Sequence, residues 1–132
     1  MKKRFCILII EDDHRRIRWF NNQLTGHCDL DVFENAELGI KAVKENKYDI
    51  IFLDHDLGGR IFVPSDDPNT GYQVAKTLKE SLNKDTRVIV HSFNPEGVDK
   101  IVSAIGKNAV KKPFGTFEIK FDENGGVIVK DT

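Results

Sequence analysis

Ionisable side chains gather where apolar runs of this sequence end. The run at residues 50–53 is followed by Asp54, His55 and Asp56, and an equally apolar run at residues 5–10 is followed by acids. Such runs are typical of strands buried on both faces of a parallel sheet, and ligands bind beyond the carboxyl ends of those strands. Four runs together supply the candidate site residues: Glu11, Asp12, Asp13, Asp54, His55, Asp56, His91, Ser92 and Lys112.

These residue types indicate phosphate chemistry that depends on a divalent cation. Carboxylates that lie close together repel one another unless a hard cation sits between them, and Mg²⁺ is usually held by a few carboxylates, water and phosphate oxygens. A lysine and a hydroxyl nearby, here Lys112 and Ser92, would bind the phosphate oxygens. The alternatives are purely structural roles: the acids cap turns, Ser92 caps the turn after it, and Lys112 is a surface residue.

The elements that position these residues alternate between strand and helix. Apolar runs predict five strands, and apolar residues at helical spacing predict helices between them, including one over residues 71–83. This alternation indicates a parallel sheet with helices on both faces. In the tail, alternating apolar residues on both sides of the turn-rich segment 122–126 predict a β-hairpin over residues 116–130.

The length of 132 residues suits a single domain over residues 1–132, with its core at residues 5–114.

The segment 58–70 is rich in Gly, Pro and Asp and is longer than an ordinary strand-to-helix connection, so it is either a lid or disordered. Phe62 and Val63 within it either form the apolar tip of a lid or pack back onto the domain.

The composition excludes several classes of partner. Lys and Arg number 20 against 21 Asp and Glu, so the net charge of -1 predicts no membrane partner and no nucleic-acid surface beyond a phosphorylated end. Cys6 and Cys28 have no metal-binding spacing and are expected to be reduced thiols in the cytoplasm. The basic start and the short apolar run after it are too short for a secretion signal.

The sequence resembles the receiver domain of two-component response regulators, which has a CheY-like fold. Residues 7–12 are similar to the first strand and acidic pair of that family, and residues 112–114 to its Lys-Pro motif. Asp54 lies at the position of the phospho-accepting aspartate and Ser92 at that of the switch Ser or Thr. The resemblance covers about residues 5–114.

The resemblance implies a doubly wound, flavodoxin-like α/β fold with five parallel strands in the order 2-1-3-4-5. The predicted hairpin then occupies the position of the fifth helix. An acyl phosphate on Asp54 is also implied, with its oxygens contacted by Ser92 and Lys112. The candidate ligands for Mg²⁺ or another divalent cation are Glu11, Asp12, Asp54 and, from the same acidic cluster, Asp56.

Two segments depart from ordinary receiver domains. Residues 54–58, DHDLG, and residues 91–97, HSFNPEG, are similar to the signatures D-H-D-L-G and H-S-x-N-x-x-G of an offshoot, the cyclic-phosphate processing receiver domain. That resemblance implies that His55 and His91 open a cyclic phosphate, one as base and one as acid.

The geometry of the two histidines can also be considered from strand alternation. If Asp54 and Ser92 point toward the acidic pocket, His55 and His91 point to the other side, where they face each other's surroundings on neighbouring strands. They then either act as a pair or are buried, hydrogen-bonded structural residues. A shared pocket would favour the first reading.

Two functional hypotheses follow. The first is an enzyme that hydrolyses the cyclic phosphate of a small molecule or of an RNA end, with Asp54, His55, His91, Ser92 and Lys112 as the catalytic set. The second is a conventional single-domain response regulator that is phosphorylated on Asp54 by a phosphodonor protein and takes part in two-component signalling. The expected partner is therefore a phosphate-bearing small molecule or a phosphodonor protein.

Overall fold

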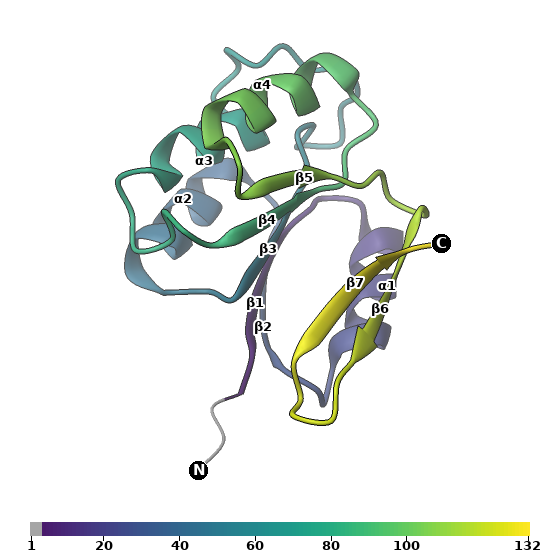
Figure 1. Cartoon of the computed structure of the whole chain (residues 1–132). Helices are drawn as coiled ribbons and strands as arrows, with labels where there is room; N and C mark the ends of the chain where they lie inside the picture. Colours follow the sequence, from purple (N-terminus) through teal and green to yellow (C-terminus); the bar gives the residue numbers. More distant parts are fainter. Residues whose placement is uncertain (1–3) are drawn as a thin grey trace.

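A five-stranded parallel sheet forms the centre of the computed structural model, which describes residues 4–132 (Figure 1). The first three residues of the predicted basic start lie outside the described residues. The strand order β2-β1-β3-β4-β5 confirms the predicted order. The strands are β1 Cys6–Ile10, β2 Asp29–Phe33, β3 Ile50–Leu53, β4 Arg87–Val90 and β5 Ala109–Lys111.

Helices cover both faces of the sheet, which confirms the doubly wound architecture. Three helices, α2, α3 and α4, lie on one face, and α1 lies on the other (Figure 1). Within residues 4–132, no helix is both long and apolar enough to cross a membrane. The helices are α1 His14–Leu24, α2 Ala36–Glu45, α3 Gly71–Leu78 and α4 Pro95–Ile105.

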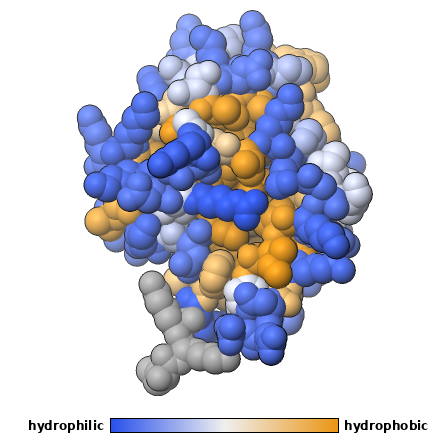
Figure 2. Space-filling model, viewed as in Figure 1, coloured by the Kyte–Doolittle hydropathy of each residue, from blue (hydrophilic) through white to orange (hydrophobic). Residues whose placement is uncertain are grey.

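The tail forms the predicted antiparallel hairpin from β6 Phe117–Phe121 and β7 Val127–Asp131. It packs beside α1 on the same face of the sheet (Figure 1). Because side chains alternate along a strand, one face of the hairpin is apolar, and this face packs into the cluster around Phe20 and Phe52. In the view of Figure 1, apolar side chains are visible in the middle of the surface, with polar side chains around and across them (Figure 2).

Helix α3 is shorter than the sequence pattern predicts. It ends at Leu78 rather than near residue 83, and Leu82, which the pattern assigned to its buried face, is 56% exposed. After Leu78 the chain leaves the helical path, and this turn places the side chain of Asn83 in the interior, where it forms three hydrogen bonds with the backbone. Its amide donates to the carbonyl oxygens of Val43 at 2.8 Å and Asn46 at 2.7 Å, and its side-chain oxygen accepts from the backbone N–H of Tyr48.

Replacing Asn83 with Ala should therefore destabilise the fold. Two carbonyl groups and one N–H group would lose their partners in the interior, and an unsatisfied buried group costs about 1–3 kcal/mol. We expect the free energy of unfolding to fall by about 2–4 kcal/mol in urea denaturation. The neighbouring variant Leu82→Ala is the control, since an exposed side chain should change stability by less than about 0.5 kcal/mol. Equal losses in both variants would contradict this role of Asn83.

Candidate functional site

The ends of β1, β3 and β4 bring three polar side chains side by side. Ile10 pairs with Leu53, and Leu53 pairs with Val90, so the next residues along these strands, Glu11, Asp54 and His91, lie at one level. One ligating atom from each lies within 4.8 Å of the others. All three are buried, and they lie on the α1 side of the sheet because residues alternate between its faces.

This register corrects the sequence-based view of the histidines by one residue. We expected His55 and His91 to point to the side of the sheet opposite Asp54 and Ser92, whereas His91 is level with Asp54 and lies on the same side as Asp54. A shift of one residue moves a side chain to the opposite face of the sheet. His91 therefore lies on the α1 face, with its ring centroid 5.5 Å from that of Phe20, while His55 lies beneath α4.

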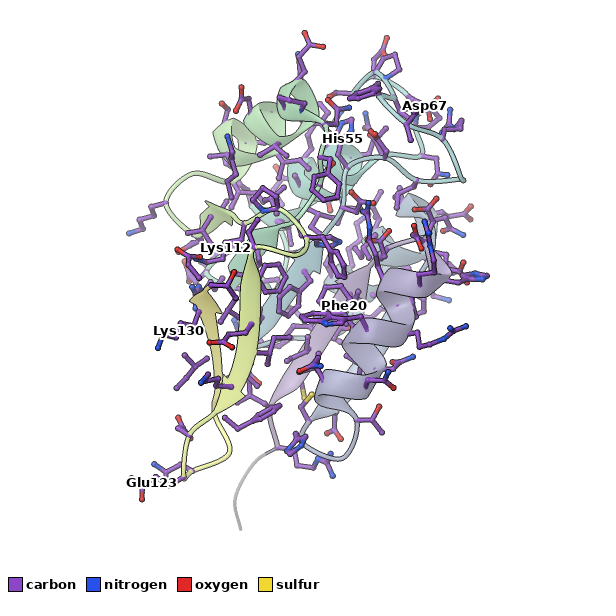
Figure 3. The ribbon with its side chains drawn as sticks, turned by 90° about the vertical axis from the view of Figure 1, so that its right-hand side faces the viewer. Phe20, His55, Asp67, Lys112, Glu123 and Lys130 are labelled. Carbon is purple, nitrogen blue, oxygen red and sulfur yellow. The ribbon has the colours of Figure 1, made fainter. Side chains whose placement is uncertain are left out.

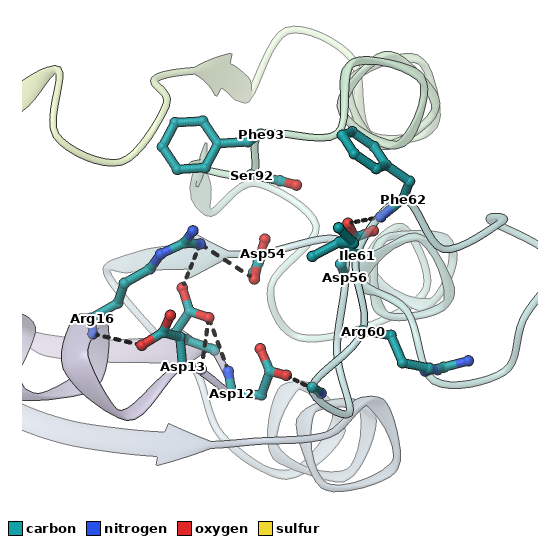
Figure 4. A pocket seen from close by; sticks show the side chains of 12 residues that line it. Asp12, Asp13, Arg16, Asp54, Asp56, Arg60, Ile61, Phe62, Ser92 and Phe93 are labelled. Atoms are coloured by element: carbon teal, nitrogen blue, oxygen red, sulfur yellow. Dashed lines mark hydrogen bonds and ion pairs between the residues drawn. The ribbon is translucent and has the colours of Figure 1, made fainter.

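A pocket of about 320 Å³ opens above these strand ends (Figure 4). The predicted site residues that line it are Glu11, Asp12, Asp13, Asp54, Asp56 and Ser92. Both histidines are fully buried and neither lines this pocket, so the structure does not bring them together as a pair. The remaining lining residues are Arg16, Gly59, Arg60, Ile61, Phe62 and Phe93.

The pKa values of Glu11 and Asp54 are shifted in opposite directions. Burial alone would raise the pKa of Glu11, but the hydrogen bond and charge attraction of His91, with Nε2 at 2.9 Å, lower that pKa to about 2. Burial, followed by repulsion from ionised Glu11, raises the pKa of Asp54 well above its ordinary value. One carboxyl group of the pair is therefore readily ionised, and the other resists ionisation.

The cluster of Glu11, Asp54 and His91 fits a divalent cation chemically. Two carboxylates and an imidazole are common metal ligands, and a cation between the carboxylates would remove their repulsion. The Nδ1 atom of His91 is buried without a hydrogen-bond partner in residues 4–132, so Nε2 is the nitrogen that faces the carboxylates. Asp12 also lines the pocket; burial raises its pKa, and its side chain accepts from the backbone N–H of Gly59.

Asp56 has a different environment from the other predicted metal ligands. Its Oδ1 atom accepts from the amide of Asn94 at 2.9 Å and lies 2.8 Å from Nδ1 of His55, while its Oδ2 atom accepts from the N–H of Phe62. Burial would raise the pKa of Asp56, but these hydrogen bonds lower it. The carboxylate therefore organises the long connection between β3 and α3.

Four residues from the two histidine-containing signatures form one clamp on this connection: His55, Asp56, Asn94 and Gly97. His55 links Asp56 to the hydroxyl of Ser65, at 2.8 Å from its Nε2 atom, and its ring lies against the start of α4. That close packing requires a glycine at position 97, because a Cβ there would collide with the imidazole. Asn94 caps α4 by accepting from the N–H of Gly97.

The connection over residues 58–70 is thus an ordered loop with an exposed tip. Val63 packs back into the interior, but Phe62 is 68% exposed and Ile61 is 79% exposed at the mouth of the pocket. Phe62 also adopts a left-handed backbone conformation with φ of 52°, which is strained for a bulky residue. Of the two residues considered in the sequence analysis, Val63 packs back onto the domain, and Phe62 lies at the exposed tip of the loop.

Lys112 does not reach the pocket in this structure. Its backbone N–H donates to the carbonyl of Val90, but its ammonium group pairs with Asp131 at the end of β7. Figure 3 shows Lys112 beside the hairpin, away from His55 and the loop. Ser92, by contrast, lines the pocket, where its hydroxyl accepts from the N–H of Asn94.

Sequence reasoning missed Arg16. It lies in the first turn of α1, after the Asp13 cap, and its Nη1 atom is 3.4 Å from Glu11 and 3.8 Å from Asp54. The signal was present, because Arg16 follows the acidic run of the first strand closely.

This fold with acids at the ends of its central strands defines a receiver domain. The chain is similar to the receiver domain of the sensor histidine kinase PA1611 from Pseudomonas aeruginosa, solved with a magnesium ion in its active-site cleft (TM-score 0.66, 16% identity, covering 86% of this chain and 87% of that one). It is also similar to the phosphorylated cyanobacterial phytochrome response regulator RcpA (TM-score 0.65, 17% identity, 86% and 84% covered). No curated protein matches the sequence.

Residues 7–107 match the model of a particular family, the cyclic-phosphate processing receiver domain. The match spans most of the chain, including both histidine-containing signatures. The chain belongs to this family, as its sequence motifs predicted.

Removing the charge of Asp54 should stabilise the protein in a pH-dependent way. A carboxyl group with a raised pKa binds more protons in the folded state than in the unfolded state, so its contribution to stability falls as the pH rises above its ordinary value of 3.8. We expect Asp54→Asn to unfold at a higher temperature than the wild type at pH 7, with the gain shrinking toward pH 4. Each unit of raised pKa corresponds to about 1.4 kcal/mol. Thermal denaturation between pH 4 and 7 measures this, with the exposed Asp85→Asn as control; a gain independent of pH would contradict it.

Weakening the clamp should loosen the loop over residues 58–70. Asn94→Ser keeps a side chain that can cap α4 but removes the amide that holds Asp56. We expect tryptic cleavage after Arg60 to become at least about tenfold faster, because a loss of about 1.4 kcal/mol raises the open population tenfold. Mass spectrometry of the first fragments measures this, with Asn124→Ser in the hairpin turn as control. Unchanged cleavage after Arg60 would show that the amide does not hold the loop.

Proposed function

We propose that this receiver domain opens a cyclic phosphodiester in the pocket above Asp54, assisted by a divalent cation. The observation that carries the proposal is the contact of His91 with Glu11, at 2.9 Å, inside the same cluster as Asp54. This contact joins a histidine, the side chain that most often transfers protons in enzymes, to a carboxylate that lines the pocket. Membership of the cyclic-phosphate processing family supports the substrate class.

The proposed reaction is a hydrolysis. The oxygen of a water molecule bonds to phosphorus, one phosphorus–oxygen bond of the ring breaks, and the proton released by the water ends on the departing alkoxide. Glu11 and His91 share the proton during this exchange, and Ser92 offers a hydroxyl to the phosphate. A divalent cation held by Glu11, Asp54 and Asp12 would supply positive charge that stabilises the phosphate oxygens; the Pseudomonas relative has magnesium in its cleft.

The two histidines have different roles in this proposal. His91 serves proton transfer, whereas His55 positions the loop through Asp56 and Ser65. The role of His55 as an acid or base, expected from the family resemblance, is thereby replaced by a positioning role.

Turnover by single variants tests the proposal. We expect purified protein with Mg²⁺ or Mn²⁺ to hydrolyse at least one member of a panel of cyclic phosphates, such as nucleoside 2′,3′-cyclic phosphates. His91→Gln should lower kcat about 100-fold, the scale of general acid–base catalysis, and Asp54→Asn should lower it at least as much. His55→Gln should mainly raise KM by loosening the loop. Full activity of His91→Gln would contradict the proposed proton transfer.

A second function is favoured by one specific observation. Both histidines are fully buried and neither lines the pocket, as in a receiver that uses Asp54 alone. In that case Asp54 accepts a phosphoryl group from a phosphodonor protein. Incubation with acetyl phosphate and Mg²⁺ separates the two functions: a stable phosphoryl group on Asp54, absent in Asp54→Asn, without any cyclic-phosphate turnover would establish the phosphoacceptor.

A further inference from the structure

We propose that Arg16, and not Lys112, is the residue that binds the phosphate oxygens in this pocket. This inference rests on the proposed function only for the class of ligand, a phosphate group, and holds for either reaction considered above. It assigns a specific role to a cation from α1 that neither signature of the family contains.

The position of Arg16 gives it access to the ligand. Its side chain is 23% exposed, and its Nη1 atom lies 3.4 Å from Glu11 Oε1 and 3.8 Å from Asp54 Oδ2. Figure 4 shows the guanidinium group directed into the pocket, between Asp54 and Phe93. A phosphate held next to Asp54 would therefore meet the N–H groups of this side chain.

Two aromatic rings hold the guanidinium group in place. Its central carbon lies 4.9 Å from the ring centroid of Phe93 and 5.4 Å from that of Phe114. Stacking of this kind attracts the cation and limits its rotamers, so less entropy is lost when it binds a ligand. It also explains why Phe93, directly after Ser92, remains 55% exposed at the rim: it covers Arg16 rather than the core.

The other two cationic side chains considered for this role, Lys112 and Arg60, are paired with carboxylates outside the cluster of Glu11 and Asp54. Lys112 is held by Asp131, an interaction made available by the hairpin that replaces the fifth helix. Within residues 4–132, the pocket is lined by only one further cationic residue, Arg60, which is paired with Asp67 in the exposed loop. Of these three cations, Arg16 is the one that forms an ion pair with Asp54.

The chemistry of an arginine suits both states of the pocket. Without a ligand, the guanidinium group offsets the charge of Glu11 and Asp54. When a divalent cation takes over those carboxylates, the N–H groups of Arg16 become available to phosphate oxygens, which a planar guanidinium binds in a bidentate manner. Arg16 therefore lowers the affinity of the pocket for the metal ion and raises its affinity for the phosphate.

These two opposite effects give a test that separates binding from a structural role. Mg²⁺ alone, and beryllofluoride as a phosphoryl analogue in saturating Mg²⁺, are titrated into wild type, Arg16→Gln and Lys112→Gln by calorimetry. We expect Arg16→Gln to bind Mg²⁺ about two- to fivefold more tightly, because a competing positive charge is gone. The same variant should bind beryllofluoride at least about tenfold more weakly, the loss of a charge-assisted hydrogen bond. Lys112→Gln should stay within about twofold of wild type for both probes.

Each alternative result overturns the inference. If Lys112→Gln loses beryllofluoride affinity as strongly as Arg16→Gln, or more strongly, the phosphate-binding cation is not Arg16 alone. If Arg16→Gln loses affinity for both probes, its role is structural, and Arg16→Lys would then restore Mg²⁺ binding without restoring the analogue. If wild type binds no analogue, both this inference and a phosphate ligand fail. Tight binding of the analogue without cyclic-phosphate turnover removes only the hydrolytic function.

Discussion

The structure depends on one unfavourable interaction, the burial of two carboxylates, Glu11 and Asp54, at adjacent strand ends. Repulsion between them in a poorly solvated site raises the pKa of Asp54, and the surrounding residues compensate only in part. His91 contacts Glu11 through Nε2 at 2.9 Å, and Arg16 pairs with both carboxylates. A fold stabilised for its own sake would avoid this arrangement, and such perturbed carboxyl groups gather at functional sites. The cation and the phosphate that we propose for this pocket would together offset these charges.

The clamp on the loop is a separate construction that uses the opposite face of the sheet. His55, Asp56 and Asn94 are mutually hydrogen-bonded, and their carboxylate is stabilised by donors rather than opposed by another charge. Because Asp54 and His55 are consecutive, the same strand end supplies the pocket carboxylate to one face and the loop anchor to the other. The two histidines of the family signatures thus serve two different layers of the molecule.

Much of the fold could be predicted from the sequence, because continuous apolar runs and their order determine a parallel sheet. Pocket residues such as Asp54 and Ser92 were also predictable, since strand ends collect at one edge. The face of the sheet on which His91 lies could not be predicted. It depends on where the strand begins and how it pairs with its neighbour, and an error of one residue moves a side chain to the opposite face. The pairing of Lys112 with Asp131 is likewise a contact between distant segments that no local pattern encodes.

The rings around Arg16 continue beyond the pocket. Phe114, which stacks on the guanidinium group, lies 5.2 Å from Trp19, and Trp19 lies 5.7 Å from Phe117 at the start of β6. A row of edge-to-face aromatic contacts therefore connects the interior of the pocket to the hairpin on the outside. Since Trp19 is the single tryptophan of the chain, this row gives the protein a native fluorophore in the path between ligand and surface. A ligand that displaces the guanidinium group of Arg16 from Phe114 is therefore expected to change the fluorescence of Trp19.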